Sequence, residues 1–220
     1  MARTLMRAAP PGGPIRSGRG RPRDPGLEDR VFDAAIALYA DVGWAGFTFD
    51  ALAKRSGVGK DALYRRWGAA RAGLLRQTLE ARWYGVSSIN TGSIREDLLA
   101  LARLSLRLRT GPYGKVGLHM MVDTMRFPEV ADILRSYGEA TVRQARSIVR
   151  RAIDRGELPP ATNPGLVMDM VVGSVTNHVA TTPQRLRPAM TAKMDDFAVS
   201  LVDVLLSGLK SVGVSAASRR

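Results

Sequence analysis

The sequence contains no cysteine and only two histidines, His119 and His178. The missing cysteine excludes disulfide bonds and Cys-ligated zinc, and it fits a reducing cytoplasm. With two histidines far apart along the chain, a transition-metal sensor is not expected. No apolar run approaches the roughly 20 residues that a membrane-spanning helix needs. We therefore expect a cytoplasmic protein that uses no metal and no cofactor.

Sequence motifs of catalysis are missing as well. The chain has no GxSxG sequence, no glycine-rich phosphate-binding loop and no His-Glu-x-x-His sequence. Acidic residues are scarce relative to basic ones, since 20 Asp and Glu stand against 33 Lys and Arg and the formal net charge is +13. A positive charge of this size favours polyanionic partners. The sequence therefore predicts a binding protein and not an enzyme.

No strand pattern or internal repeat is present either. Apolar side chains recur with the period of helices, and clusters of Gly, Pro, Ser and Asn interrupt them. The sequence therefore predicts an all-α fold of about nine helices, the last of them capped by Thr191. We expect the helices at residues 24–43, 49–55, 60–67, 70–84, 93–109, 115–124, 128–155, 163–181 and 191–209.

The stretch from Thr48 to Trp67 predicts two short helices joined by a tight turn. Thr48 is a favourable N-cap residue for the first helix. Gly57 stands where the chain must reverse, and only glycine adopts a left-handed backbone at little cost. The apolar core of the pair is expected to consist of Leu52, Val58 and Leu63. This is the helix-turn-helix pattern, whose second helix enters the major groove of DNA.

The outer face of this motif is basic. Between Asp50 and Arg76 there are seven basic residues and two acidic ones. Helical spacing allows Lys60, Tyr64 and Arg71 to share one side of the second helix and its exit. Lys and Arg charges and a Tyr hydroxyl are groups that bind phosphate. The alternative interpretation is an ordinary helical hairpin with a solvated basic face.

Two segments resemble the N-terminal domain of TetR-family transcriptional regulators: DRVFDAAIALYADVGW at residues 29–44 and FTFDALAKRSGVGKDALYRRW at residues 47–67. The resemblance implies an all-helical C-terminal domain that binds small molecules and dimerises. Two departures stand out. Gly59 replaces the usual helix-capping Ser or Thr, and Gly68 to Arg71 replace a Pro/Gly-Ser-Lys segment, so the fourth helix lacks its usual cap.

The resemblance also indicates which residues contact DNA. Residues 1–23 should be a disordered basic arm, because they are rich in Pro, Gly and Arg and contain no acid. The end of this arm resembles a segment that enters the minor groove, although a solubilising tail is the alternative. The residues expected to bind DNA are Arg19, Arg21, Arg23, Thr48, Gly59, Lys60, Asp61, Tyr64, Arg65, Arg66 and Arg71.

The helices after residue 85 carry flexible or large apolar side chains with a few polar groups among them. Such a mixture is how small-molecule sites are usually built. The alternative is a plain core, since Met fills gaps and a lone His on an apolar helix is commonly a hydrogen-bonded core residue. The expected ligand is mainly apolar, with an acidic or hydrogen-bonding end. Its candidate contacts are His119, Met120, Met125, Phe127, Met170, Asn177 and His178.

The last two helices predict a subunit interface. The helix at 163–181 is apolar nearly all round, so it needs neighbours on every side. Apolar residues of the final helix, Val204 among them, recur at spacings of three and four. A monomeric bundle core is the alternative to a four-helix interface between two subunits. The residues expected between subunits are Gly173, Ser174, Met194, Phe197, Leu201 and Leu205.

Together these patterns predict a homodimeric repressor that leaves a palindromic operator when a small molecule binds. The chain divides into the arm at 1–23, a DNA-binding domain with a linking helix at 24–84, and a ligand-binding and dimerisation domain at 85–220. One alternative is a constitutive DNA-compacting protein with little sequence preference. Another is an α-helical enzyme with a basic groove, against which the missing catalytic motifs argue.

Overall fold

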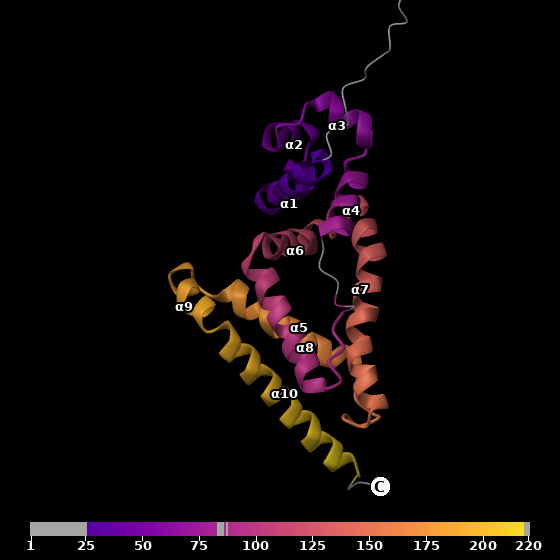
Figure 1. Ribbon diagram of the computed structural model, residues 1–220, viewed down its shortest axis with the longest axis vertical. Coiled ribbons are helices and arrows are strands. Elements are labelled where there is room, and N and C mark those ends of the chain that lie inside the picture. The colour runs from indigo at the N-terminus through magenta and orange to yellow at the C-terminus, as the bar shows by residue number, and fades with distance from the viewer. Residues whose placement is uncertain (1–25, 83–85, 87, 218–220) are drawn as a thin grey trace, which may run out of the picture.

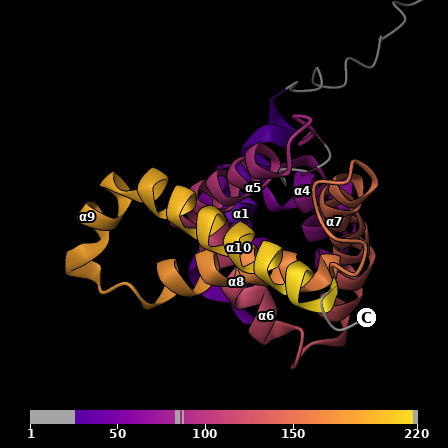
Figure 2. The ribbon, with the colours of Figure 1, turned by 90° about the horizontal axis from the view of Figure 1, so that it is seen from below.

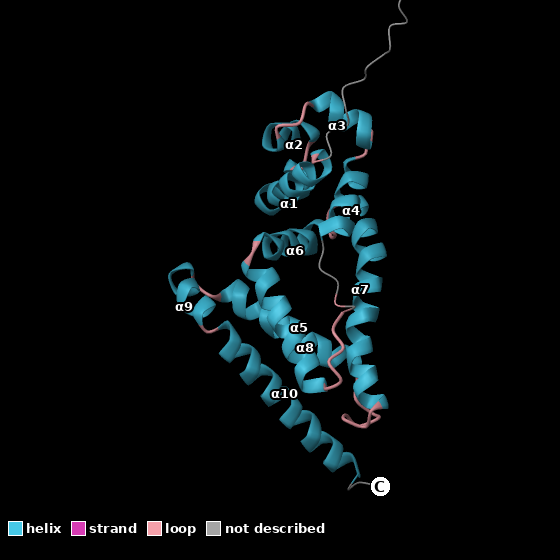
Figure 3. Ribbon diagram, viewed as in Figure 1, coloured by secondary structure: helices cyan, strands magenta, loops and turns pink. Residues whose placement is uncertain are grey.

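The computed structural model describes residues 26–82, 86 and 88–217, and within them the fold is entirely helical, with no strand (Figures 1 and 3). This confirms the predicted all-α class. No described helix is both long enough and apolar enough to cross a bilayer. The helices are α1 (Leu27–Gly46), α2 (Phe49–Ser56), α3 (Lys60–Trp67), α4 (Arg71–Arg82), α5 (Ile94–Thr110), α6 (Pro112–Asp123), α7 (Pro128–Asp154), α8 (Pro164–Thr181), α9 (Arg187–Ala192) and α10 (Met194–Ala217).

The described part of the chain has one more α-helix than the nine expected. The difference lies between residues 182 and 193, where a short 3₁₀ turn (Gln184–Leu186) leads directly into α9. Pro188 stands in the first turn of α9, where proline is compatible with helix. The prediction that Thr191 caps the last helix was therefore wrong, because Thr191 lies inside α9 and α10 starts three residues later.

Most other predicted boundaries agree with the structure to within a few residues, but α10 continues to Ala217, eight residues beyond the end expected at residue 209. Asn163 caps α8 as expected, since its Oδ1 accepts hydrogen bonds from the backbone N–H groups of Gly165 at 2.8 Å and Leu166 at 3.3 Å. Ser93 precedes α5 as predicted, but its side chain makes no capping bond. The expected start of the first helix at residues 24–25 lies outside the described residues.

Two hydrophobic clusters hold the helices together. One contains residues of α1, α2, α3 and α4, together with Val116 and Met120 of α6 and Val130 and Ile133 of α7. The other joins α5, the second half of α7, α8 and α10. In Figure 1, α1 to α3 form one end of the molecule and α10 lies at the other, and α7 runs between them. Seen from below, α10 lies across α8 and α9 projects to the side (Figure 2).

A buried carboxylate on α6 ties α6 to α1. Asp123 is 7% exposed, and its Oδ2 accepts two hydrogen bonds of 2.8 Å, from the Tyr39 hydroxyl and from the backbone N–H of Trp44. Burial and the neighbouring carboxylate raise the pKa of Tyr39 far above its usual range, so Tyr39 is a permanent donor. The ring of His119 lies edge-on to Tyr39. These contacts fix α6 against the end of α1.

Two further helices, α4 and α7, contact the corner between α1 and α2, which is the segment from Trp44 to Phe47. Glu129 of α7 accepts a 2.9 Å hydrogen bond from the Trp44 indole. Arg71, the first residue of α4, donates to the carbonyls of Trp44 at 3.0 Å and Phe47 at 3.1 Å. Its guanidinium also lies 4.1 Å from the centre of the Trp44 ring. The segment that leads into α2 is therefore bound from α4, α6 and α7.

Gly43 makes the approach of α6 possible. The sequence predicted that Gly43 ends the first helix, and its backbone does leave the helical conformation there, with φ of 60° and ψ of −165°. A Cβ at this position would lie 2.8 Å from Nδ1 of His119 and 3.2 Å from Oδ2 of Asp123. Glycine is therefore required for the backbone conformation and for the space.

Removing the Asp123 carboxylate should destabilise the fold. Asp123→Ala leaves two buried donors without an acceptor, and each such loss costs about 1–3 kcal/mol of unfolding free energy. Asp123→Asn keeps one acceptor oxygen and should lose less. Urea denaturation measures both, with Asp132→Ala, an exposed residue paired with Arg135, as the control. Equal stability of Asp123→Ala and the control would contradict this role.

Candidate nucleic-acid interface

The helix-turn-helix motif is built as the sequence predicts. The hydroxyl of Thr48 accepts a 3.2 Å hydrogen bond from the N–H of Ala51 and so caps α2. Gly57 has φ of 68°, in the left-handed region, and its N–H donates to the carbonyl of Ala53 at 3.1 Å. Only two residues then separate Gly57 from α3. The cap, the turn glycine and the bounds of α3 are therefore confirmed.

The expected core residues Leu52, Val58 and Leu63 are all buried. The sequence analysis did not include Trp67, which is also buried and packs its ring 6.1 Å from that of Phe32 in α1. Its spacing of four residues from Leu63 was the available signal, because residues i and i+4 share a helix face. This core fixes one side of α3 and leaves the opposite side exposed.

The exposed side of α3 carries the polar residues that the sequence singled out. Lys60, Asp61, Tyr64, Arg65 and Arg66 are all exposed, and Thr48 and Gly59 lie exposed just before the two helices. The Tyr64 ring packs 4.7 Å from that of Phe49, which orients it. Gly59 precedes α3 without any side-chain cap, as its residue type dictates. The structure thus brings seven of the predicted DNA-facing residues to one end of the molecule.

Arg71 does not belong to this group. Helical spacing predicted that it lies beside Lys60 and Tyr64, but Arg71 is half-buried and its guanidinium donates to the Trp44 and Phe47 carbonyls. The chain reverses at Gly68, with φ of 65°, so α4 begins beside the corner between α1 and α2 and not along the line of α3. The remaining predicted residues, Arg19, Arg21 and Arg23, lie outside the described residues.

Comparison with known families agrees with this geometry. Residues 31–78 match the family model described as bacterial regulatory proteins, tetR family, and residues 89–198 match a tetracyclin repressor-like C-terminal domain. The HTH-type transcriptional regulator AqdR of Rhodococcus erythropolis is 30% identical over 167 residues, covering 76% of this chain and 81% of AqdR. The chain belongs to the TetR family. It is therefore a DNA-binding transcriptional regulator, as the sequence predicted.

Other transcriptional regulators are similar to this chain in sequence or in fold. The regulator YdeS of Bacillus subtilis is 25% identical over 162 residues, covering 73% of this chain and 82% of YdeS. A TetR-family regulator from Rhodococcus sp. has a TM-score of 0.63 at 18% identity, covering 82% and 98% of the two chains. FadR of Bacillus subtilis, solved with stearoyl-CoA, has a TM-score of 0.59 at 15% identity, covering 82% and 98%. At such identities the structures show a common fold.

The residues predicted to bind a ligand are not gathered around one cavity in this TetR-family chain. Met120 is buried against the DNA-binding end, His119 faces Tyr39, and Phe127 packs on the same cluster. The other four lie elsewhere: Met125 is 79% exposed, Met170 and Asn177 are exposed, and the His178 ring stacks on that of Phe197 at 4.0 Å. The structure thus separates these side chains, because α6 turns its buried face toward α1, and ligand binding by any of them stays a prediction.

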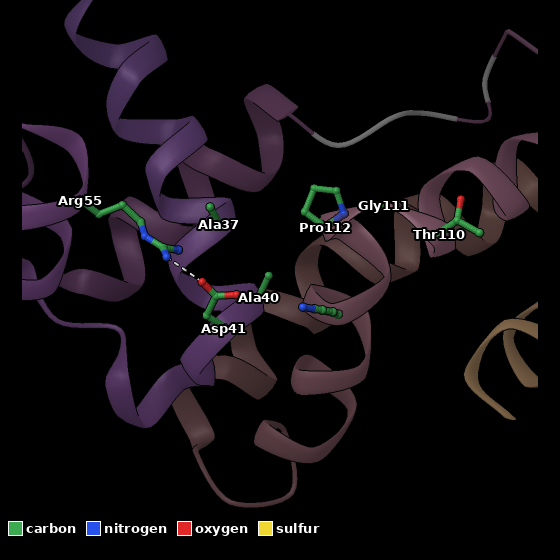
Figure 4. A pocket seen from close by; sticks show the side chains of 8 residues that line it. Ala37, Ala40, Asp41, Arg55, Thr110, Gly111 and Pro112 are labelled. Atoms are coloured by element: carbon green, nitrogen blue, oxygen red, sulfur yellow. Dashed lines mark hydrogen bonds and ion pairs between the residues drawn. The ribbon is translucent and has the colours of Figure 1, made fainter. Parts of the chain in front are cut away.

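A hollow of about 380 Å³ lies between the two ends of the molecule (Figure 4). It is bounded by α1, α2 and the turn between α5 and α6. Within it, Asp41 and Arg55 form an ion pair of 2.6 Å, which lowers the pKa of Asp41. The lining residues are Ala37, Ala40, Asp41, Arg55, Thr110, Gly111, Pro112 and Lys115, and none of the predicted ligand residues is among them.

An apolar face of α8 and α10 is exposed in the single chain. On α8 it contains Leu166, Met170 and Gly173, and on α10 it contains Val204, which is 73% exposed. Met194, Phe197, Leu201 and Ser174, all predicted to lie between subunits, are half-buried. Leu205 needs correction. Its side chain is only 3% exposed within its own subunit, because it packs in the core of the second cluster. A second subunit could therefore bury almost no further surface of Leu205.

Proposed function

We propose that this TetR-family regulator is a homodimeric repressor of a palindromic operator. The observation that carries this proposal is the exposed polar side of α3, which stands at the end of the molecule on a buried helix-turn-helix core. Helices exposed in this way insert into the major groove, which is wide enough for one α-helix. The two-fold symmetry of a homodimer would match a palindromic site.

On DNA, Lys60, Arg65 and Arg66 supply the charge, and Tyr64 supplies a hydroxyl donor. Thr48 and Gly59 lie at the N-terminal ends of α2 and α3, where backbone N–H groups favour phosphate. Arg71 takes a different role from the one the sequence suggested, because its guanidinium holds the corner between α1 and α2. The arm, with Arg19, Arg21 and Arg23, is proposed to enter the adjacent minor groove.

The partner of the exposed α8 and α10 face is a second copy of the same chain. Leu166, Met170 and Gly173 follow one another at spacings of four and three on α8, and Phe197, Leu201 and Val204 do so on α10. Two such helices from each subunit form a four-helix interface. Gly173 and Gly208, both exposed, leave room for close helix approach. This face includes Gly173, Phe197 and Leu201 of the predicted interface, and Leu205 is left out because it is buried within its own subunit.

A small-molecule effector is proposed to control DNA binding. FadR of Bacillus subtilis was solved with stearoyl-CoA, which has a long apolar chain and acidic phosphates. A ligand of that character suits the exposed apolar side of α6, formed by Leu118, Met121, Val122 and the adjoining Met125. An effector releases DNA only when it binds the DNA-incompetent arrangement more tightly than the competent one.

The domain division follows the same proposal. Residues 24–84 form the DNA-binding domain with its linking helix, and residues 85–220 form the effector and dimerisation domain. The hydrophobic clusters add one refinement, since α6 and the start of α7 pack against the first domain and not only within the second. An effector bound to the second domain would therefore act on the DNA-binding domain through α6 and the start of α7.

Substitutions on α3 test the DNA contact. The double variant Lys60→Ala, Tyr64→Phe should bind operator DNA more weakly, since it removes one cation and one hydroxyl donor. If Lys60 contacts a phosphate, the slope of log affinity against log salt should fall by about 0.9 per subunit contact. Titration of labelled DNA at several salt concentrations measures both quantities, and circular dichroism confirms that the variant is folded. Wild-type affinity in the folded variant would refute the assignment.

A charge at Val204 tests the subunit interface. Because Val204 is 73% exposed in one chain, Val204→Asp should leave an isolated subunit folded. In a dimer the same substitution buries an unpaired charge, so it should shift the equilibrium strongly toward monomer. Analytical ultracentrifugation at micromolar concentration gives the result. Met125→Asp, on a side chain that is 79% exposed beyond α6, is the matched control and should remain dimeric.

A monomeric wild-type protein, or a Val204→Asp variant that dimerises as well as the control, would contradict the proposed interface.

A further inference from the structure

Two of the three basic residues on α3 already have acidic partners within the DNA-binding end of the protein. Nζ of Lys60 lies 2.5 Å from Oδ1 of Asp50, and the guanidinium of Arg66 contacts the carboxylate of Glu28. Arg65, which lies between them, has no ion pair within the part of the chain that the structure describes. The hydrogen bond that Lys60 donates to Asp50 also raises the pKa of Lys60, so Lys60 stays charged while it is paired.

The two pairs occupy opposite ends of α3. Lys60 is the first residue of α3 and reaches back across the turn to Asp50 in the first turn of α2. Arg66 stands in the last turn of α3 and reaches Glu28 in the first turn of α1. All four side chains are about half exposed or more, so both pairs lie on the surface of the DNA-binding domain, at the two ends of α3. Neither pair involves the second domain.

Exposed ion pairs of this kind contribute little to folding stability, because solvent screens them and the side chains lose freedom. Their effect on a bound polyanion is different. A phosphate that approaches Lys60 must either displace the Asp50 carboxylate or accept it as a neighbour within a few ångströms. That distance is well inside the screening length of about 8 Å at physiological salt, so the two anions repel each other.

We propose that Asp50 and Glu28 compete with DNA phosphates for Lys60 and Arg66, and so hold the DNA affinity of α3 below the value that its basic residues alone would give. The inference rests on the proposed contact between α3 and DNA. It adds two acidic residues that tune affinity without contributing a favourable contact. Weaker general attraction to DNA helps a regulator, because most of the DNA in a cell is non-operator sequence.

Neutral isosteric variants test this competition. Asp50→Asn and Glu28→Gln should each tighten binding by about two- to fivefold for every engaged α3, which is the upper part of the range measured for exposed ion pairs. The probes are a labelled duplex from upstream of the protein's own gene and a labelled duplex of unrelated sequence, titrated by fluorescence anisotropy. The gain should diminish as salt is raised, since salt screens exposed charges.

The ion pair between Asp41 and Arg55 provides a matched control. It also joins an exposed Asp to an exposed Arg, at 2.6 Å, but it lies in the hollow that faces the turn between α5 and α6 (Figure 4). Asp41→Asn removes the same charge from the same domain away from α3. It should therefore change DNA affinity by less than twofold. An equal gain in Asp41→Asn would show a general charge effect and would overturn the proposal.

A double-mutant cycle separates this inference from the proposed function. Asp50→Asn should tighten binding in the wild-type background and have no effect in a Lys60→Ala background. If Lys60→Ala weakens binding but Asp50→Asn and Glu28→Gln leave it unchanged or reduce it, α3 still contacts DNA and the acids only orient its cations. That outcome overturns the inference alone. If Lys60→Ala has no effect on DNA binding, the proposed contact and the inference both fail.

Discussion

The arrangement of this protein depends on the buried carboxylate of Asp123. It accepts hydrogen bonds from the Tyr39 hydroxyl and the Trp44 N–H, and thereby joins α6 to the end of α1 across a sequence distance of about 80 residues. A buried acid without such donors would be strongly unfavourable, so these bonds constrain both partners to one geometry. The same corner is bound by Arg71 and Glu129, from α4 and α7. The position of the helix-turn-helix motif relative to the second domain is therefore set by directional polar contacts within an apolar cluster.

This constraint connects the two ends of the molecule. Val116 and Met120 on the inner side of α6 are part of the core under the DNA-binding end, and Leu118 and Met121 on its outer side are exposed. A displacement of α6 would move Asp123 with it, and the corner at Trp44 would follow or lose two hydrogen bonds. The proposed control by an effector on the outer side of α6 would need no other connection. The proposed competition by Asp50 and Glu28 would be separate from it, because both residues belong to the first domain.

Local signals in the sequence were sufficient for most of the helices and for the helix-turn-helix motif, although α9 was missed. Thr48 specifies a cap through its hydroxyl, and Gly57 specifies a left-handed turn because it has no Cβ, and the structure has both. Predictions failed where long-range packing decides. Nothing near Met120 indicates that its side chain faces α1, and helical spacing alone could not distinguish Leu205, in the core, from Val204, on the surface. The position of Arg71 was predicted wrongly because the chain reverses at Gly68. That turn brings its guanidinium to the carbonyls of Trp44 and Phe47.

Hydroxyl-radical footprinting of the DNA upstream of the protein's own gene tests whether two copies of α3 bind a palindrome. We expect two protected segments on one face of the duplex, related by a dyad and centred about 10 base pairs, or a multiple of this, apart. Diffuse protection along the whole fragment, without symmetry and equal on unrelated DNA, would exclude such binding and favour a DNA-compacting protein.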